Sequence, residues 1–239
     1  MNAPSVSLRE LRWAGACYLA IIALGLWGEA FVRASLVVPG DAAATAQQIA
    51  AHPLLWRSGL VGDFLMQVLD IPVIVMMWRL LRPVNEPLAL TATALNLVQT
   101  CVLVANRVQL LLPLDAVSGP MAAAFPPAQR EALALLAVQL HGQGFGIGLI
   151  FFGFACLIRG ALIAHSRLLP PVLGWLLALA GVGYLLNSFA LLLWPPLAAQ
   201  LFPWVLMPAL VGETALALHL LLRRRALTRL PCSAPPAAG

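Results

Sequence analysis

Long hydrophobic runs alternate with short polar or proline-containing segments along the whole chain. Six runs are long enough to cross a bilayer as helices, at about 1.5 Å per residue, and they cover residues 11–38, 60–81, 88–112, 131–158, 172–193 and 203–222. A shorter segment, 42–51, follows the helix-capping residue Asp41 and stops at His52-Pro53, so we expect a surface helix there. The pattern predicts an all-α fold, a polytopic membrane protein built as a six-transmembrane-helix bundle.

Composition supports the same class of protein. The chain has 239 residues, of which 62% are hydrophobic and 10% charged, whereas soluble domains carry about 25% charged residues. We expect one transmembrane domain over residues 1–230 and a disordered cytoplasmic tail over 231–239. The four cysteines show no C-x-x-C spacing, which argues against a disulfide framework or a thiolate metal site. No nucleic-acid-binding pattern accompanies the net charge of +5, so we expect no nucleic-acid partner.

The arginines at the ends of the runs predict the orientation in the membrane. Six helices place both termini on one side, and ten arginines then fall at that face against Arg57 and Arg130 at the other. This positive-inside bias predicts that both termini are cytoplasmic. The ten are Arg9, Arg12, Arg79, Arg82, Arg159, Arg167, Arg223, Arg224, Arg225 and Arg229.

Charged side chains inside the hydrophobic runs are the candidate site. A charged residue at the bilayer centre costs about 2.5–3.5 kcal/mol on insertion scales, and such residues usually face the bundle interior. In the predicted topology, polar residues of all six helices lie between the midplane and the outer face, so we infer a polar cavity reachable from the outer face. The candidate ligand-binding residues are Glu29, Arg33, Asp63, Asp70, Arg107, His141 and Glu213.

Three functions stay open at this stage. In the first, the protein binds, transports or senses a ligand. Four carboxylates against two arginines favour a cation, a proton or a cationic ligand. The arginines could instead position an anionic group of a small molecule or lipid. Alternatively, His141 serves an intramembrane enzyme with a lipid-like substrate, as general base or as a metal ligand with Asp63 and Asp70. In a third interpretation, the polar residues only lock the helices of a structural or regulatory subunit together. A transporter with six helices would need to form a homo-oligomer. The sequence does not identify a cofactor.

A set of short motifs distributed over nearly the whole chain carries a family resemblance. They are Trp13-Ala14-Gly15, Glu29 to Arg33, Val38-Pro39-Gly40-Asp41, Arg57-Ser58-Gly59 with Asp63, Leu80-Leu81-Arg82-Pro83-Val84-Asn85, His141 with Gly144, Phe151-Phe152-Gly153, Pro170-Pro171-Val172-Leu173-Gly174, Gly181 with Tyr184, and Gly212-Glu213. Together they resemble an uncharacterised bacterial membrane family, domain of unknown function 4386. The resemblance implies a bacterial multi-pass protein of the inner membrane. It implies no activity, because none is assigned to that family.

Overall fold

The computed structural model describes residues 6–166 and 168–224, and within these ranges the regular structure is helical. Six helical stretches are long and apolar enough to cross a membrane, which confirms the predicted fold class. The elements are α1 (Leu8–Leu26), the π-helix η1 (Trp27–Arg33), α2 (Ala34–Leu36), α3 (Ala42–Ala51), α4 (Pro53–Leu81), α5 (Glu86–Arg107), η2 (Val108–Leu111), α6 (Leu112–Ser118), η3 (Pro120–Ala123), α7 (Pro127–Ser166), α8 (Pro171–Leu193), α9 (Pro195–Leu201), η4 (Trp204–Leu206) and α10 (Met207–Leu222).

Local capping chemistry explains where several helices begin. Ser7 and Glu10 form a capping box at the start of α1, and the Asp41 side chain accepts from the Ala44 N–H at the start of α3. The Asn85 side chain caps α5 in the same way, 3.1 Å from the Leu88 nitrogen. The short surface helix that follows Asp41 is therefore confirmed, with the predicted bounds.

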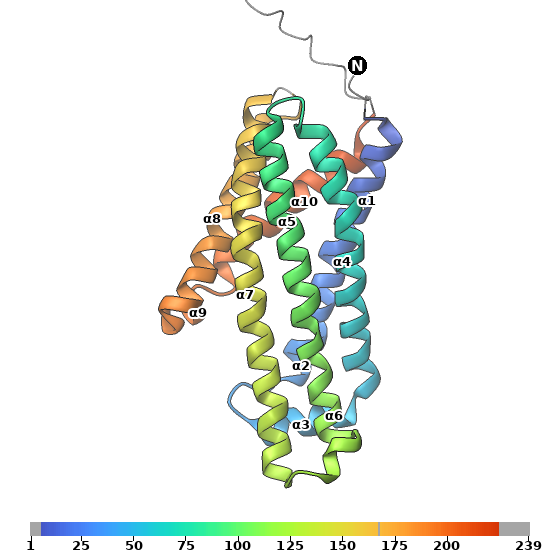
Figure 1. Cartoon of the computed structure of the whole chain (residues 1–239), viewed down its shortest axis with the longest axis vertical. Helices are drawn as coiled ribbons and strands as arrows, with labels where there is room; N and C mark the ends of the chain where they lie inside the picture. Colours follow the sequence, from blue (N-terminus) through green and yellow to red (C-terminus); the bar gives the residue numbers. More distant parts are fainter. Residues whose placement is uncertain (1–5, 167, 225–239) are drawn as a thin grey trace, which may run out of the picture.

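The six long stretches form a closed ring. α1 packs on α4, α4 on α5, α5 on α7, α7 on α8, α8 on α10, and α10 returns to α1. In Figure 1 the chain begins at one end of the bundle, and α3 and α6 lie at the opposite end. α7 and α8 approach closely at Gly160 and Gly174, where a methyl group on either glycine would lie 2.5–2.6 Å from backbone atoms of the other helix.

α7 is longer than a membrane requires. Its 40 residues extend about 60 Å, roughly twice the thickness of the hydrocarbon core. The part of α7 farthest from the chain termini packs against α3 and α6. The hydrophobic core at that end comes from η1, α2, α3, α4, η2 and α6 and is formed by Val32, Leu36, Ile49, Trp56, Leu60, Leu110 and Leu114. We call this region the distal cap.

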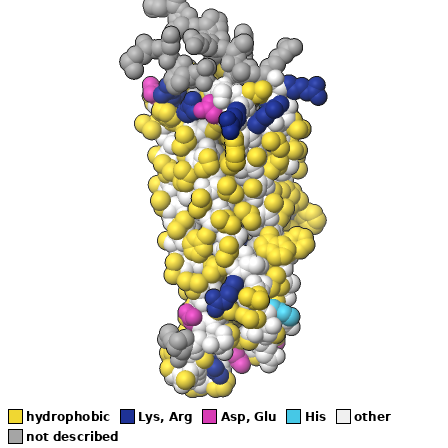
Figure 2. All heavy atoms as spheres, turned by 90° about the vertical axis from the view of Figure 1, so that its right-hand side faces the viewer, with side chains coloured by type: hydrophobic (Ala, Val, Ile, Leu, Met, Phe, Trp, Pro, Cys, Tyr) yellow, Lys and Arg dark blue, Asp and Glu magenta, His cyan; other side chains and the backbone are white. Residues whose placement is uncertain are grey.

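The outer surface of the bundle is apolar. Figure 2 shows hydrophobic side chains covering its middle and arginine side chains gathered at the end that bears the N-terminus. On α4, the exposed residues Val61, Leu65 and Val68 alternate with the buried residues Asp63 and Gln67, so the polar face points inward. Such a surface is suited to contact with lipid. The cytoplasmic location of the termini stays a prediction.

One of the ten arginines is buried inside the bundle. Arg159 lies on α7, which continues for seven residues beyond it, to Ser166. Its side chain is buried and donates a hydrogen bond to Asn96 on α5. Arg167, Arg225, Arg229 and the predicted tail over 231–239 lie outside the described residues.

Candidate functional site

The predicted site residues fall into two groups at different heights along the bundle. The distal layer, on the side of the distal cap, contains Glu29, Arg33, Asp63, Asn106, Arg107 and His141. The proximal layer, nearer the chain termini, contains Asp70, Asn96, Thr100, Arg159, Tyr184 and Glu213. Asp63 and Asp70 share one side of α4, but seven residues separate them by about 10 Å along the helix axis.

Asp63 is the centre of the distal layer. Its carboxylate is fully buried and accepts two hydrogen bonds from Arg33, with N–O distances of 2.7 and 3.4 Å. The Nε atom of Arg107, which is 1% exposed, lies 3.5 Å from the same carboxylate. Two guanidinium groups from η1 and α5 therefore converge on one carboxylate of α4.

The π-helix η1 supplies Glu29 and Arg33. The Ala34 N–H bonds to the Glu29 carbonyl, five residues back, and such segments in other proteins are frequently found at functional sites. Arg33 Nε donates to the Glu29 carboxylate at 2.7 Å, and the Glu29 side chain is 61% exposed. Gly28 leaves room for these groups, because a methyl group there would lie 2.9 Å from Asp63 Oδ1.

His141 connects α7 to the distal layer. Arg107 Nη1 lies 3.2 Å from His141 Nε2, and because a guanidinium only donates, that ring nitrogen is the acceptor. The Asn106 amide donates to the His141 carbonyl oxygen at 2.8 Å and also lies 3.0 Å from Nδ1. Both ring nitrogens therefore face polar groups of α5.

The distal layer has a surplus of buried positive charge. Glu29 and Asp63 balance Arg33 and Arg107 in number, but the Glu29 side chain is largely exposed. The buried part then holds two guanidinium groups and one carboxylate. Arg107 Nε makes no hydrogen bond within the described residues, and the guanidinium stacks over the Phe145 ring at 5.4 Å.

The proximal layer is a separate network. Asp70 accepts from Thr100 at 2.7 Å and from Asn96 at 3.0 Å, and Asn96 in turn accepts from Arg159. Glu213 on α10 accepts from the Tyr184 hydroxyl on α8 at 2.5 Å. This layer joins residues of α4, α5, α7, α8 and α10.

Five residues of the two layers were not among the predicted ligand-binding residues: Asn96, Thr100, Asn106, Arg159 and Tyr184. The sequence does hint that Arg159 is buried, because the apolar run resumes after Gly160 with Ala161, Leu162 and Ile163. Tyr184 carries no such signal. Its role depends on the neighbouring helix, which the sequence does not specify.

A three-ligand metal site of His141, Asp63 and Asp70 is not formed. The two aspartates belong to different layers, and the described residues contain no group of three or more His, Cys, Asp or Glu side chains that could hold a metal ion. The chemistry that the distal layer can perform is ion pairing and hydrogen bonding by two buried guanidinium groups.

Fold and interior together define a polytopic helical membrane protein with ionisable groups inside its bundle. The family model described as domain of unknown function (DUF4386) matches residues 13–223. The chain belongs to this family, as its motifs predicted. No curated protein and no solved structure matches the chain.

Proposed function

We propose that this protein binds a small anionic ligand, carrying a carboxylate or a phosphate, at the distal layer and transports or senses it. The observation that supports this proposal is the ratio of two buried guanidinium groups to one buried carboxylate around Asp63. A buried surplus charge is costly unless it is paired. A bound anion would supply the missing negative charge.

The Nε donor of Arg107, which lies 3.5 Å from Asp63 without a hydrogen bond, supports an anion in particular. A guanidinium has five N–H donors in a planar fork that matches carboxylate and phosphate oxygens. Within the described residues, Arg107 directs one donor to His141, and its Nε atom makes no hydrogen bond. Charge-assisted bonds of this type are about twice as strong as bonds between neutral groups.

Glu29 is the group that an incoming anion could replace on Arg33. Its carboxylate pairs with Arg33 but is largely exposed, and exposed ion pairs contribute only about 0–1 kcal/mol. An incoming anion would displace Glu29 from Arg33 at little cost while Asp63 keeps its place. The sequence favoured a cation because four carboxylates were counted against two arginines. That excess of carboxylates belongs to the two layers combined and not to the distal layer.

Replacement of Arg107 tests the proposal. Full-length wild-type protein and the Arg107→Gln variant are purified in mild detergent and analysed by native mass spectrometry, with Arg57→Gln as a control that removes an exposed arginine of α4. We expect a co-purified anion, or stabilisation by added citrate or phosphate, in wild type and Arg57→Gln only. A ligand at 100 times its dissociation constant stabilises by about 2.7 kcal/mol. Absence of both effects in folded wild-type protein would contradict the proposal.

A structural lock is the competing function, and the contacts between helices favour it. Asp63 ties η1 and α5 to α4, and His141 ties α7 to α5. On this alternative Arg107→Gln fails to accumulate as folded protein, whereas the binding proposal expects a folded variant without ligand. An enzyme that uses His141 is the less favoured alternative, because the Nε2 atom of this histidine already accepts a hydrogen bond from Arg107.

A further inference from the structure

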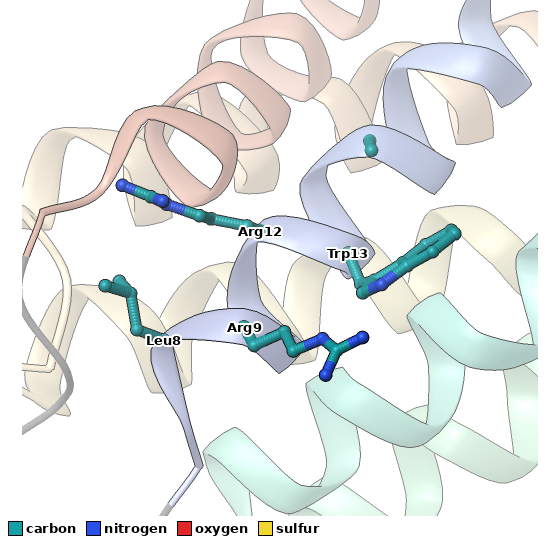
Figure 3. A pocket seen from close by; sticks show the side chains of 5 residues that line it. Leu8, Arg9, Arg12 and Trp13 are labelled. Atoms are coloured by element: carbon teal, nitrogen blue, oxygen red, sulfur yellow. The ribbon is translucent and has the colours of Figure 1, made fainter.

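A hollow opens on the surface of α1 in its first two turns. It has a volume of about 530 Å³ and is lined by Leu8, Arg9, Arg12, Trp13 and Ala16. Arg9, Arg12, Trp13 and Ala16 have the spacing of residues on one helix face. Figure 3 shows Arg12 extending toward α10, whereas Arg9 and Trp13 extend to the other side of α1.

A second hollow lies on α10, which packs against α1. It has a volume of about 460 Å³ and is lined by Leu218, His219, Leu222, Arg223 and Arg224. Arg12 Nε donates a hydrogen bond of 3.2 Å to the Arg223 carbonyl oxygen, so the two helix ends are joined at this point. The joint between α1 and α10 therefore carries four arginines with apolar side chains beside them.

The arginines of α1 have no acidic partner in this region. Among the described residues, neither Arg9 nor Arg12 forms an ion pair. The adjacent acid, Glu10, is bound by Arg79 and by the Ser7 N–H. Residues 1–5 and 225–239 contain no Asp or Glu. Within the part of the chain that the structure describes, the hollow on α1 consequently presents positive charge that no Asp or Glu side chain neutralises.

The hollow also has the chemistry of a membrane interface. It begins at the first turn of α1, where the hydrophobic run starts, and the Trp13 side chain is 63% exposed. Tryptophan is enriched at the level of the lipid headgroups, because its ring is apolar and its N–H is polar. Basic pockets between helices at this depth suit anionic headgroups.

We infer that the joint between α1 and α10 binds the phosphate of an anionic phospholipid in the surrounding leaflet. Arg9 and Arg12 pair with the phosphate oxygens, since guanidinium groups match phosphate geometry. Trp13, Leu8 and Ala16 contact the glycerol and the upper acyl chain. This site is separate from the distal layer, so it does not rest on the function proposed above.

Lipid titration of the full chain tests the inference. Delipidated protein in detergent is titrated with phosphatidylglycerol or phosphatidylcholine, and bound lipid is counted by native mass spectrometry. One arginine near an anionic lipid surface contributes about fivefold in affinity. We therefore expect the Arg9→Gln/Arg12→Gln variant to bind phosphatidylglycerol about 30-fold more weakly, with no change for phosphatidylcholine.

Two further variants separate the site from a general effect of charge. Arg57→Gln/Arg130→Gln removes the same net charge near the opposite end of the bundle and should bind phosphatidylglycerol like wild type. Arg9→Lys/Arg12→Lys keeps the charge and should retain most of the affinity. Equal losses in the two glutamine variants would overturn the inference. So would phosphatidylglycerol binding no tighter than phosphatidylcholine binding, or full competition by inorganic phosphate at the concentration of the lipid.

Discussion

Replacement of Asp63 by asparagine would disturb the carboxylate on which Arg33 and Arg107 converge. The asparagine has the same shape but loses the charge, and one carboxylate oxygen becomes an NH2 group. That NH2 would face a guanidinium of Arg33 or Arg107, and both sides would then be donors. We expect Asp63→Asn to destabilise the fold strongly.

The magnitude follows from the burial of the partners. Asp63 is 0% exposed and the side chain of Arg33 is 10% exposed, and removing one partner of a buried ion pair costs about 3–5 kcal/mol. Asparagine keeps one acceptor oxygen for Arg33, so we expect about 3 kcal/mol. Glu29→Gln is the matched comparison, because it also neutralises a partner of Arg33. The side chain of Glu29 is 61% exposed, and its loss should cost less than about 1 kcal/mol.

Unfolding in mixed micelles, followed by circular dichroism as the denaturing detergent is increased, measures both losses. Asp63→Asn combined with Arg107→Gln should recover part of the loss, because Arg33 still pairs with Glu29 and the second change removes the positive charge that has lost its carboxylate. If Asp63→Asn and Glu29→Gln cost the same, or if the double variant is less stable than the sum of its parts, the ion-pair reasoning is wrong.

Two further predictions use the same unfolding measurement. Gly144→Ala should destabilise the protein by about 1–3 kcal/mol, because the added methyl group would lie 2.1 Å from Asn106 Oδ1. At Gly142 an added methyl group meets nothing within 4 Å, so Gly142→Ala should stabilise the protein by about 0.5–1 kcal/mol. Equal effects at the two glycines would contradict this interpretation. Tyr184→Phe removes a 2.5 Å hydrogen bond to the buried carboxyl group of Glu213 and should cost about 1–3 kcal/mol; unchanged stability would show that this bond contributes nothing net.

The helices were predictable because hydrophobicity and length are properties of a single segment. The end of α7 was not, since an arginine after a hydrophobic run has the same appearance whether it faces water or a partner inside the bundle. Arg159 lies inside because Asn96 accepts its hydrogen bond. That contact requires α5 and α7 to be neighbours, and the sequence does not state the order of helices around the ring.

The sequence predicted candidate site residues but not how they are arranged. Placement by depth along each helix brought Asp63, Arg107 and His141 to similar heights, and the structure joins them. Asp70 and Glu213 were grouped with them because a charge count ignores distance. A separation of about 10 Å along α4 is enough to give Asp70 its own partners. The π-helical backbone of η1 has no signature in the residue types of that segment.

The distal cap and the membrane-spanning part of the bundle are stabilised by different forces. We expect the core around Ile49, Trp56 and Leu110, at the end of the bundle that α3 and α6 cover, to extend beyond the bilayer. Its burial would then remove apolar surface from water. Between helices in lipid that driving force is absent, and close packing and polar contacts hold the bundle together. Urea and cooling weaken the hydrophobic effect. Both treatments should therefore loosen the cap while the bundle stays assembled, and the heat-capacity increment of unfolding should come mainly from the cap.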